Sequence, residues 1–172
     1  LVFIWTKILS FDISCQSDLV KDKGQKYFLA FLNDPQVPPD QRVIACFVLC
    51  AMCAGPYKPG QIAALQAGVL RSCLRQLSLP EEQGPDTALL LRWLCLCVAS
   101  CCDGCDAARV EALRGFVPGL DPSVPVQTRS GGSPGIPLPA RSFPTSLQLL
   151  LKSAAPALRA VAVHALGNLI GG

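Results

Sequence analysis

The sequence predicts an all-α fold in which short helices stack in successive repeats. Three observations predict it. Apolar residues recur at helical spacings of three and four along most of the chain, and no segment shows the strict alternation typical of a strand. In addition, one arginine-containing motif occurs three times, as PDQRVIACFVL from Pro39, LLLRWLCLCVA from Leu89 and PALRAVAVHAL from Pro156. A motif that returns along a helical chain indicates stacked repeats, each burying its apolar face against its neighbours.

The three copies of the motif share an arginine at the fourth position and a small residue three places later. These pairs are Arg42 and Ala45, Arg92 and Cys95, and Arg159 and Ala162. A small side chain lets a neighbouring helix approach closely, and an arginine is long enough to reach the preceding repeat. We therefore assign these six positions to the structure of the repeats.

The spacing of the motifs indicates the type of repeat. Arg42 and Arg92 are 50 positions apart, whereas Arg92 and Arg159 are 67 apart. The longer interval contains residues 117–146, which are rich in Pro, Gly and Ser and lack helical periodicity, as expected of a disordered insert. Without most of this insert the interval returns to about 40, within the roughly 40 to 47 residues of armadillo and HEAT repeats.

The sequence thus predicts an armadillo/HEAT-like α-solenoid fragment of about three to four repeats. Residues 1–116 form helical repeats, 117–146 the disordered insert, and 147–172 the last repeat of the same solenoid. The chain does not begin with Met, and we treat it as a fragment. The insert also carries the segments ARSFP and PLP. We interpret the insert as a spacer, and the alternative is that these segments are short linear motifs that a partner protein binds.

The first predicted helices lie before residue 35. Ser14 is the expected N-cap of the first one. The stretch GQKYFLAFLNDP forms the next, which ends at Asn33 because the following Asp34 and Pro35 do not continue a helix. A third helix begins at Pro39, since the first helical turn tolerates the missing N–H of proline.

Further helices follow Pro59, which starts a short helix that Gly68 breaks. A second amphipathic helix then runs to Leu77. Its apolar residues share one face at i, i+3, i+4 and i+7, namely Leu70, Cys73, Leu74 and Leu77. After the cysteine-rich region, DAARVEALRGF predicts an interior side made of Ala108, Leu113 and Phe116.

Composition and charge exclude two classes of partner. Hydrophobic residues make up 51% of the chain and charged ones 16%, so most helical faces must be covered. Charged residues interrupt every apolar run before the roughly 18 residues of a membrane span, and we expect no membrane insertion. LVFIW is too short for a signal peptide.

The net charge of +3 comes from scattered basic residues, so we expect no nucleic-acid binding.

Several of the ten cysteines have the spacing of core residues. Cys46, Cys50 and Cys53 lie at i, i+4 and i+7 among aliphatic residues, and Cys97 and Cys101 are likewise four apart. A free cysteine behaves as a small hydrophobe that is readily buried. We therefore predict packed thiols and no bound metal.

A zinc-binding module is the alternative interpretation of the cysteines. Cys50 with Cys53, and Cys102 with Cys105, have the C-x2-C spacing of zinc sites. Cys102 and Cys105 are the pair to test first, because Asp103 and Gly104 between them predict a helix end. A disulfide between them is also open, although reduced thiols are the default without a secretory signal. The full ligand set of this alternative is Cys95, Cys97, Cys101, Cys102 and Cys105.

Nothing in the sequence predicts catalysis or a cofactor. His164 is the single histidine and lies in an apolar helix without an acidic partner, which favours a packed side chain. The glycines of the insert lack the Lys-Ser/Thr sequence of a phosphate-binding loop. We expect a protein that is not an enzyme.

Four stretches resemble one family. DISCQSDLVKDKGQKYFLAFLNDP (residues 12–35), PGQIAALQAGVLRSCLRQL, LLLRW and VAVHALGNLIGG are similar to the central armadillo-type domain of the raptor family, the regulatory scaffolds of the target-of-rapamycin (TOR) kinase complex. The match covers nearly all of the chain outside its first residues and the insert. The insert and several cysteines depart from the family pattern.

The resemblance implies a non-catalytic scaffold that binds protein partners in nutrient-responsive TOR signalling and growth control. The implied partners are the TOR kinase and the Rag GTPases, and the implied location is the cytoplasm with recruitment to the lysosomal surface. Candidate contact residues are Lys21, Lys23, Gln25 and Lys26, which we expect to be exposed. A generic HEAT or armadillo adaptor of another pathway is the second alternative.

Overall fold

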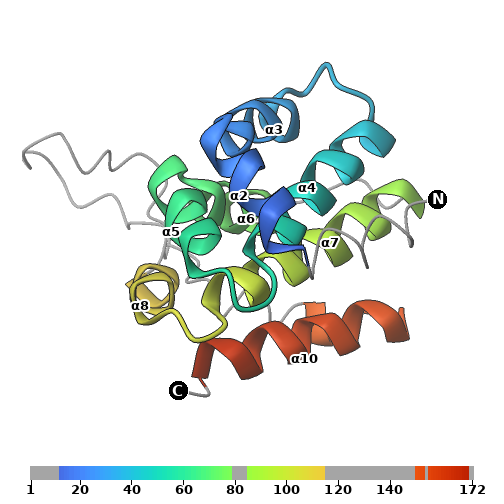
Figure 1. Cartoon of the computed structure of the whole chain (residues 1–172). Helices are drawn as coiled ribbons and strands as arrows, with labels where there is room; N and C mark the ends of the chain where they lie inside the picture. Colours follow the sequence, from blue (N-terminus) through green and yellow to red (C-terminus); the bar gives the residue numbers. More distant parts are fainter. Residues whose placement is uncertain (1–11, 79–84, 115–149, 154, 171–172) are drawn as a thin grey trace, which may run out of the picture.

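A computed structural model of the chain describes residues 12–78, 85–114, 150–153 and 155–170 (Figure 1). These residues form helices, and no strand occurs among them. The helices are α2 (Ile13–Lys21), α3 (Gly24–Asn33), α4 (Pro39–Cys53), α5 (Lys58–Ala67), α6 (Val69–Ser78), α7 (Pro85–Cys102), α8 (Asp106–Arg114) and α10 (Pro156–Ile170). The all-α prediction is confirmed.

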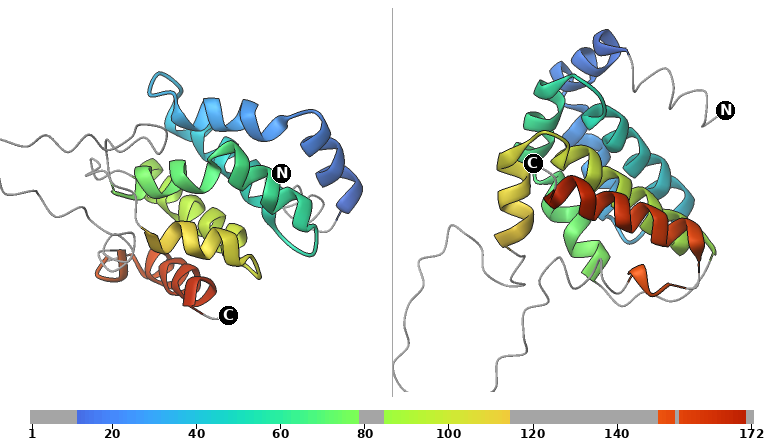
Figure 2. Two further views of the ribbon diagram at one scale, coloured as in Figure 1. Left: turned by 90° about the vertical axis from the view of Figure 1, so that its left-hand side faces the viewer. Right: turned by 90° about the horizontal axis from the view of Figure 1, so that it is seen from below.

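The helices repeat in groups of three along the chain. Two short helices precede a long one in α2, α3 and α4, and again in α5, α6 and α7. Helix α8 and the long α10 belong to the next group. The long helices lie side by side, with α7 between α4 and α10 (Figures 1 and 2). This stacking of like elements is the armadillo/HEAT-type solenoid that the sequence predicts. The predicted insert, 117–146, lies outside the described residues, so its boundaries stay a prediction.

Most helix ends follow the residues expected to cause them. Pro39 occupies the first turn of α4, and α3 ends at Asn33 as predicted. Gly68 ends α5 in a left-handed conformation with φ 83°, which glycine adopts without a steric penalty. The short α5 and amphipathic α6 are thus confirmed as separate helices.

The N-cap prediction for α2 was wrong by two residues. Asp12 caps this helix, and its Oδ1 accepts hydrogen bonds from the backbone N–H groups of Ser14 (2.9 Å) and Cys15 (3.1 Å). Ser14 lies inside the helix. Asp and Ser are both favourable N-cap residues. Asp12 is the N-cap here because its backbone is still extended, as an N-cap requires.

The core runs between the long helices and α6. On α6 the predicted stripe is confirmed, since Leu70, Cys73, Leu74 and Leu77 are all buried. The largest fully buried side chains include Leu32, Leu49, Met52, Leu90 and Leu94. No helix in the described part of the chain is both long and apolar enough to cross a membrane.

The interior side predicted for α8 is correct only in part. Ala108 is buried, but Leu113 is 54% exposed, and Phe116 lies outside the described residues. Helix α8 buries Ala108 and Ala112, which are four residues apart on one face. Leu113 follows Ala112 directly and therefore points about 100° away from that face.

Candidate functional site

Buried amide side chains tie the first helix of a group to the end of its third helix. Gln16 Nε2 in α2 donates to the carbonyls of Ala51 (2.8 Å) and Ala54 (2.9 Å) at the end of α4. Gln61 Nε2 in α5 donates in the same way to two carbonyls at the end of α7, at 2.7 and 2.8 Å. The last carbonyls of a helix lack the regular partner one turn further on, and each amide supplies hydrogen bonds to two of them.

In the third group, an arginine makes the contacts that a glutamine makes in the first two groups. Arg109 Nε in α8 lies 3.0 Å from the carbonyl of Cys102 in α7 and 3.0 Å from that of Asn168 in α10. Gln16, Gln61 and Arg109 are separated by 45 and 48 positions, which gives the period of the structural repeat. Gln16 and Gln61 hold helices of one group together, whereas Arg109 also joins two successive groups. The repeated motif did not reveal these residues, because it lies on the third helices only.

The arginines of the motif have different surroundings. Arg42 in α4 donates from Nε to the carbonyl of Leu32 (3.2 Å) and from Nη2 to Oε1 of Gln76 (2.8 Å), joining α3, α4 and α6. Arg159 donates from Nη1 to the Ser153 carbonyl at 2.9 Å. The side chain of Arg92 is exposed, and no hydrogen bond joins it to another described residue. Arg42 joins its group to α6 of the following group and not to a preceding repeat, as had been expected. The bridging role stays a prediction at Arg92 and Arg159.

The small residues of the motif lie where the long helices pack. Ala45, Cys95 and Ala162 are 2%, 0% and 0% exposed, one each in α4, α7 and α10. Since α7 packs against both other helices, these positions keep side-chain bulk low in the centre of the solenoid.

The candidate partner surface is basic but smaller than expected. Lys21, Lys23 and Lys26 are exposed where α2 meets α3, and Lys23 adopts a left-handed φ of 58° in the turn. Lys21 Nζ also pairs with Asp18 at 3.2 Å on the surface. The prediction that Gln25 belongs to this surface was wrong, since Gln25 is buried. It follows Gly24 in the first turn of α3, on the side that faces the neighbouring helices.

All ten thiols are free, and eight of them are buried. Cys15 is exposed and Cys105 is half-buried. Core packing is thus confirmed for Cys46, Cys50 and Cys53 in α4 and for Cys97 and Cys101 in α7. Burial raises the pKa of Cys50, Cys95 and Cys102 to about 12, which keeps these thiols protonated at neutral pH.

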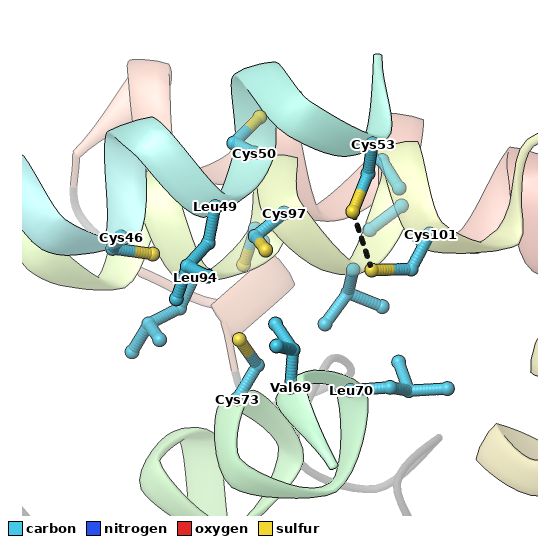
Figure 3. Close-up of a cluster of buried hydrophobic side chains, with 14 of the residues drawn as sticks. Cys46, Leu49, Cys50, Cys53, Val69, Leu70, Cys73, Leu94, Cys97 and Cys101 are labelled. Carbon is cyan, nitrogen blue, oxygen red and sulfur yellow. Dashed lines mark hydrogen bonds between the residues drawn. The ribbon is translucent and has the colours of Figure 1, made fainter. Parts of the chain in front are cut away.

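Five buried thiols from three helices meet in one cluster (Figure 3), which we call the thiol cluster. Its members are Cys46 and Cys53 of α4, Cys73 of α6, and Cys97 and Cys101 of α7. Cys101 Sγ donates to Cys53 Sγ at 3.6 Å. The sulfurs of Cys46, Cys73 and Cys97 lie within 4.8 Å of one another.

The thiol cluster differs from the ligand set of the predicted zinc alternative. Cys97 and Cys101 belong to both sets. Cys102 and Cys105 are not part of a metal-type group of three ligands among the described residues. Gly104 at φ 57° ends the helix between them, as predicted. Spacing in one helix could not reveal a group whose members lie on three helices.

His164 lies on the exposed face of α10, so the predicted packing of its side chain was wrong. The buried face of α10 is formed by Leu158, Ala162, Ala165 and Leu169. His164 directly precedes Ala165 in the sequence, which turns it about 100° away from this face.

Stacked three-helix groups and structural polar ties define the class of this chain as an armadillo/HEAT-type α-solenoid. No protein-family model matches it. It is 37% identical over 172 residues to the protein raptor homolog of Dictyostelium discoideum, covering 100% of this chain and 9% of that protein. It is 38% identical over 171 residues to regulatory-associated protein of TOR 2 of Oryza sativa subsp. japonica, covering 99% and 11%.

Two further comparisons agree. The target of rapamycin complex 1 subunit mip1 of Schizosaccharomyces pombe is 37% identical over 120 residues, which are 66% of this chain and 9% of that protein. The crystal structure of Chaetomium thermophilum Raptor matches with a TM-score of 0.70 and 27% identity, covering 99% of this chain and 14% of that one. The chain belongs to the raptor family as a segment of its helical solenoid. It spans about a tenth of the length of the curated relatives it matches.

Proposed function

We propose that this chain is a non-catalytic scaffold segment of a TOR kinase complex. The observation that carries the proposal is its similarity, over its whole length, to raptor homologues. A relative named as a subunit of target of rapamycin complex 1 is similar over 66% of the chain. The fold supports the proposal, since a solenoid offers a long surface built on a rigid frame. Gln16, Gln61 and Arg109 tie that frame together and leave its outer ridges for docking.

The finer proposal concerns partners and location. The TOR kinase and the Rag GTPases are the partners that we propose for the protein containing this segment. The location that fits these partners is the cytoplasm, with recruitment to the lysosomal surface when nutrients are present. Lys21, Lys23 and Lys26 form the proposed contact, because three exposed ammonium groups in one turn region attract an acidic partner surface.

Co-precipitation tests the proposal. The longest natural polypeptide that contains these 172 residues is expressed with a tag, and the TOR kinase and Rag GTPases are quantified in the eluate. We expect both to be recovered. Recovery of neither by this polypeptide would reject the assignment to TOR signalling.

A charge-reversal variant tests the surface. Changing Lys21→Glu, Lys23→Glu and Lys26→Glu together should lower recovery of one partner about tenfold, which corresponds to about 1.4 kcal/mol. The matched control changes the same three lysines to arginine, which keeps the charge. Equal recovery by both variants would remove these lysines from the contact.

Imaging tests the location. A fluorescent version of the same polypeptide should be cytoplasmic in amino-acid-starved cells and coincide with lysosomes after refeeding. A distribution that amino acids do not change would contradict the proposed recruitment.

A further inference from the structure

Three buried sulfurs converge from three different helices. Cys46 is in α4, Cys73 in α6 and Cys97 in α7, and each residue is 0% exposed. Their Sγ atoms all lie within 4.8 Å of one another (Figure 3). Because the three residues are far apart in the chain, the folding of the solenoid alone brings them together.

These separations are close to those of a metal thiolate site. Tetrahedral zinc binds thiolate sulfur at about 2.3 Å, which places two such ligands about 3.8 Å apart. Each pair of sulfurs here therefore needs to close by at most about 1 Å, a movement that rotation about the Cα–Cβ bond can supply. Soft sulfur ligands select Zn²⁺ and Cu⁺ among biological metal ions.

We propose that Cys46, Cys73 and Cys97 form a buried site for a thiophilic metal ion, Zn²⁺ or Cu⁺. On binding, the ligand thiols lose their protons to solvent and their sulfurs coordinate the ion. Cys101 offers a fourth sulfur, because its thiol interacts with that of Cys97 and with that of Cys53. The site would join α4, α6 and α7, the three helices around the core.

A cation in α4 is placed to offset the negative charge of such a site. Arg42 lies one helical turn before Cys46 in α4. Its guanidinium is held by Gln76, which lies one turn after Cys73 in α6. Three thiolates around Zn²⁺ carry a net charge of −1, and a guanidinium one turn from two of the ligands stabilises it.

Protonation opposes metal binding at this site and must be overcome. Burial raises the pKa of Cys46, and a hydrogen bond with Cys46 raises that of Cys73. The pKa of Cys97 is raised as well. Hydrogen bonds with Cys101 and Cys46 act to lower it, but the hydrogen bond with Cys73 and burial act in the opposite direction. The ion is therefore expected to bind while the helices assemble.

The test measures metal in protein that folded inside cells. The longest natural polypeptide containing these residues is produced in cells supplied with zinc in one arm and with copper in the other, and is purified under reducing conditions. Bound metal is quantified by mass spectrometry for the wild type and for two variants. These are Cys97→Ala and, as the matched control, Cys95→Ala.

Cys95 is a close control because it lies in the same helix and is equally buried. Its sulfur is not among the three that converge within 4.8 Å. We expect about one more ion per chain in the wild type and in Cys95→Ala than in Cys97→Ala, in one of the two arms. Equal metal content in wild type and Cys97→Ala in both arms overturns the proposal, as does an equal loss in Cys95→Ala.

A second measurement covers the case in which Cys97→Ala fails to fold. X-ray absorption of the metal-loaded wild type should show three or four sulfur neighbours at about 2.3 Å if the ion is zinc, and sulfur-only coordination if it is copper. A wild type that carries no metal in either arm, or whose metal has oxygen and nitrogen neighbours only, rejects the site.

Discussion

Helix α7 packs against two long helices in different ways. Toward α4 it contributes Cys97 and Cys101 to the thiol cluster, and Trp93 to an edge-on contact with Phe47 whose ring centroids are 5.0 Å apart. Toward α10 two alanines, Ala162 and Ala165, form the middle of the buried face, with Leu158 and Leu169 at its ends. There Asn168 Nδ2 donates to the carbonyl of Ala99 at 3.1 Å.

The two interfaces achieve the same stacking by different chemistry. Sulfur is polarizable and only a weak hydrogen-bond donor, so the α4 side depends mainly on packing, even though Cys101 donates to Cys53 there. Alanines let the α10 side approach closely, and one directional amide bond sets the position of α10 along α7. We infer that the α4 side contributes most through buried volume and the α10 side through close fit. Three substitutions can break or sharpen this contrast, and a fourth test, at α2, gives the size of an effect away from both interfaces.

The largest effect is expected from Leu94→Ala in α7. Leu94 is fully buried in the same core cluster as the thiols, so its truncation should leave a cavity and lower the free energy of unfolding by about 2–5 kcal/mol. Urea denaturation measures this value. Leu89→Ala, on the same helix but 40% exposed, should cost much less. Equal costs would mean that buried volume does not dominate this interface.

The next effect concerns the close fit toward α10. Ala162→Leu adds a large side chain to a fully buried position and should destabilise the protein by about 1–3 kcal/mol through overpacking. Val163→Leu is the control, because Val163 is 59% exposed on the same helix. Thermal unfolding compares the two variants. A neutral Ala162→Leu would show that α10 does not depend on close approach.

A smaller effect is expected from Asn168→Ala. The substitution removes the bond to the Ala99 carbonyl and should cost about 0.5–1.5 kcal/mol. Hydrogen exchange would then show faster exchange of α10 amides, while those of α4 keep the wild-type rate. If both helices changed alike, the amide bond would not act on α10 specifically.

The smallest effect lies far from α7, at the cap of α2. Hydrogen bonds from the backbone and thiol of Cys15 lower the pKa of Asp12, so its contribution to stability is complete above the ordinary carboxyl pKa of about 3.9. It is lost as the pH falls through the lowered value. NMR of the Cys15 amide should show fraying of α2 in that range. Asp12→Asn should abolish this pH dependence, and an unchanged titration would contradict the assignment.

The sequence predicted the helices well because their signals are local. Prolines, Gly68 and the apolar stripe of α6 each act within a few residues of their position. The sequence did not predict that Gln25 is buried or that Leu113 and His164 are exposed. Burial at these positions depends on which neighbouring helix covers each face. The thiol cluster was missed for the same reason. It joins residues up to 55 positions apart, and no spacing within one helix encodes that.

Site-resolved alkylation of the native protein tests the inward orientation of the cysteines most directly. At neutral pH we expect Cys15 to be modified, Cys105 to follow more slowly, and the eight buried thiols to react only after denaturation. Peptide mass spectrometry resolves each site. Labelling of Cys97 or Cys101 at the rate of Cys15 would contradict a solenoid whose cysteine-rich helix is its buried centre.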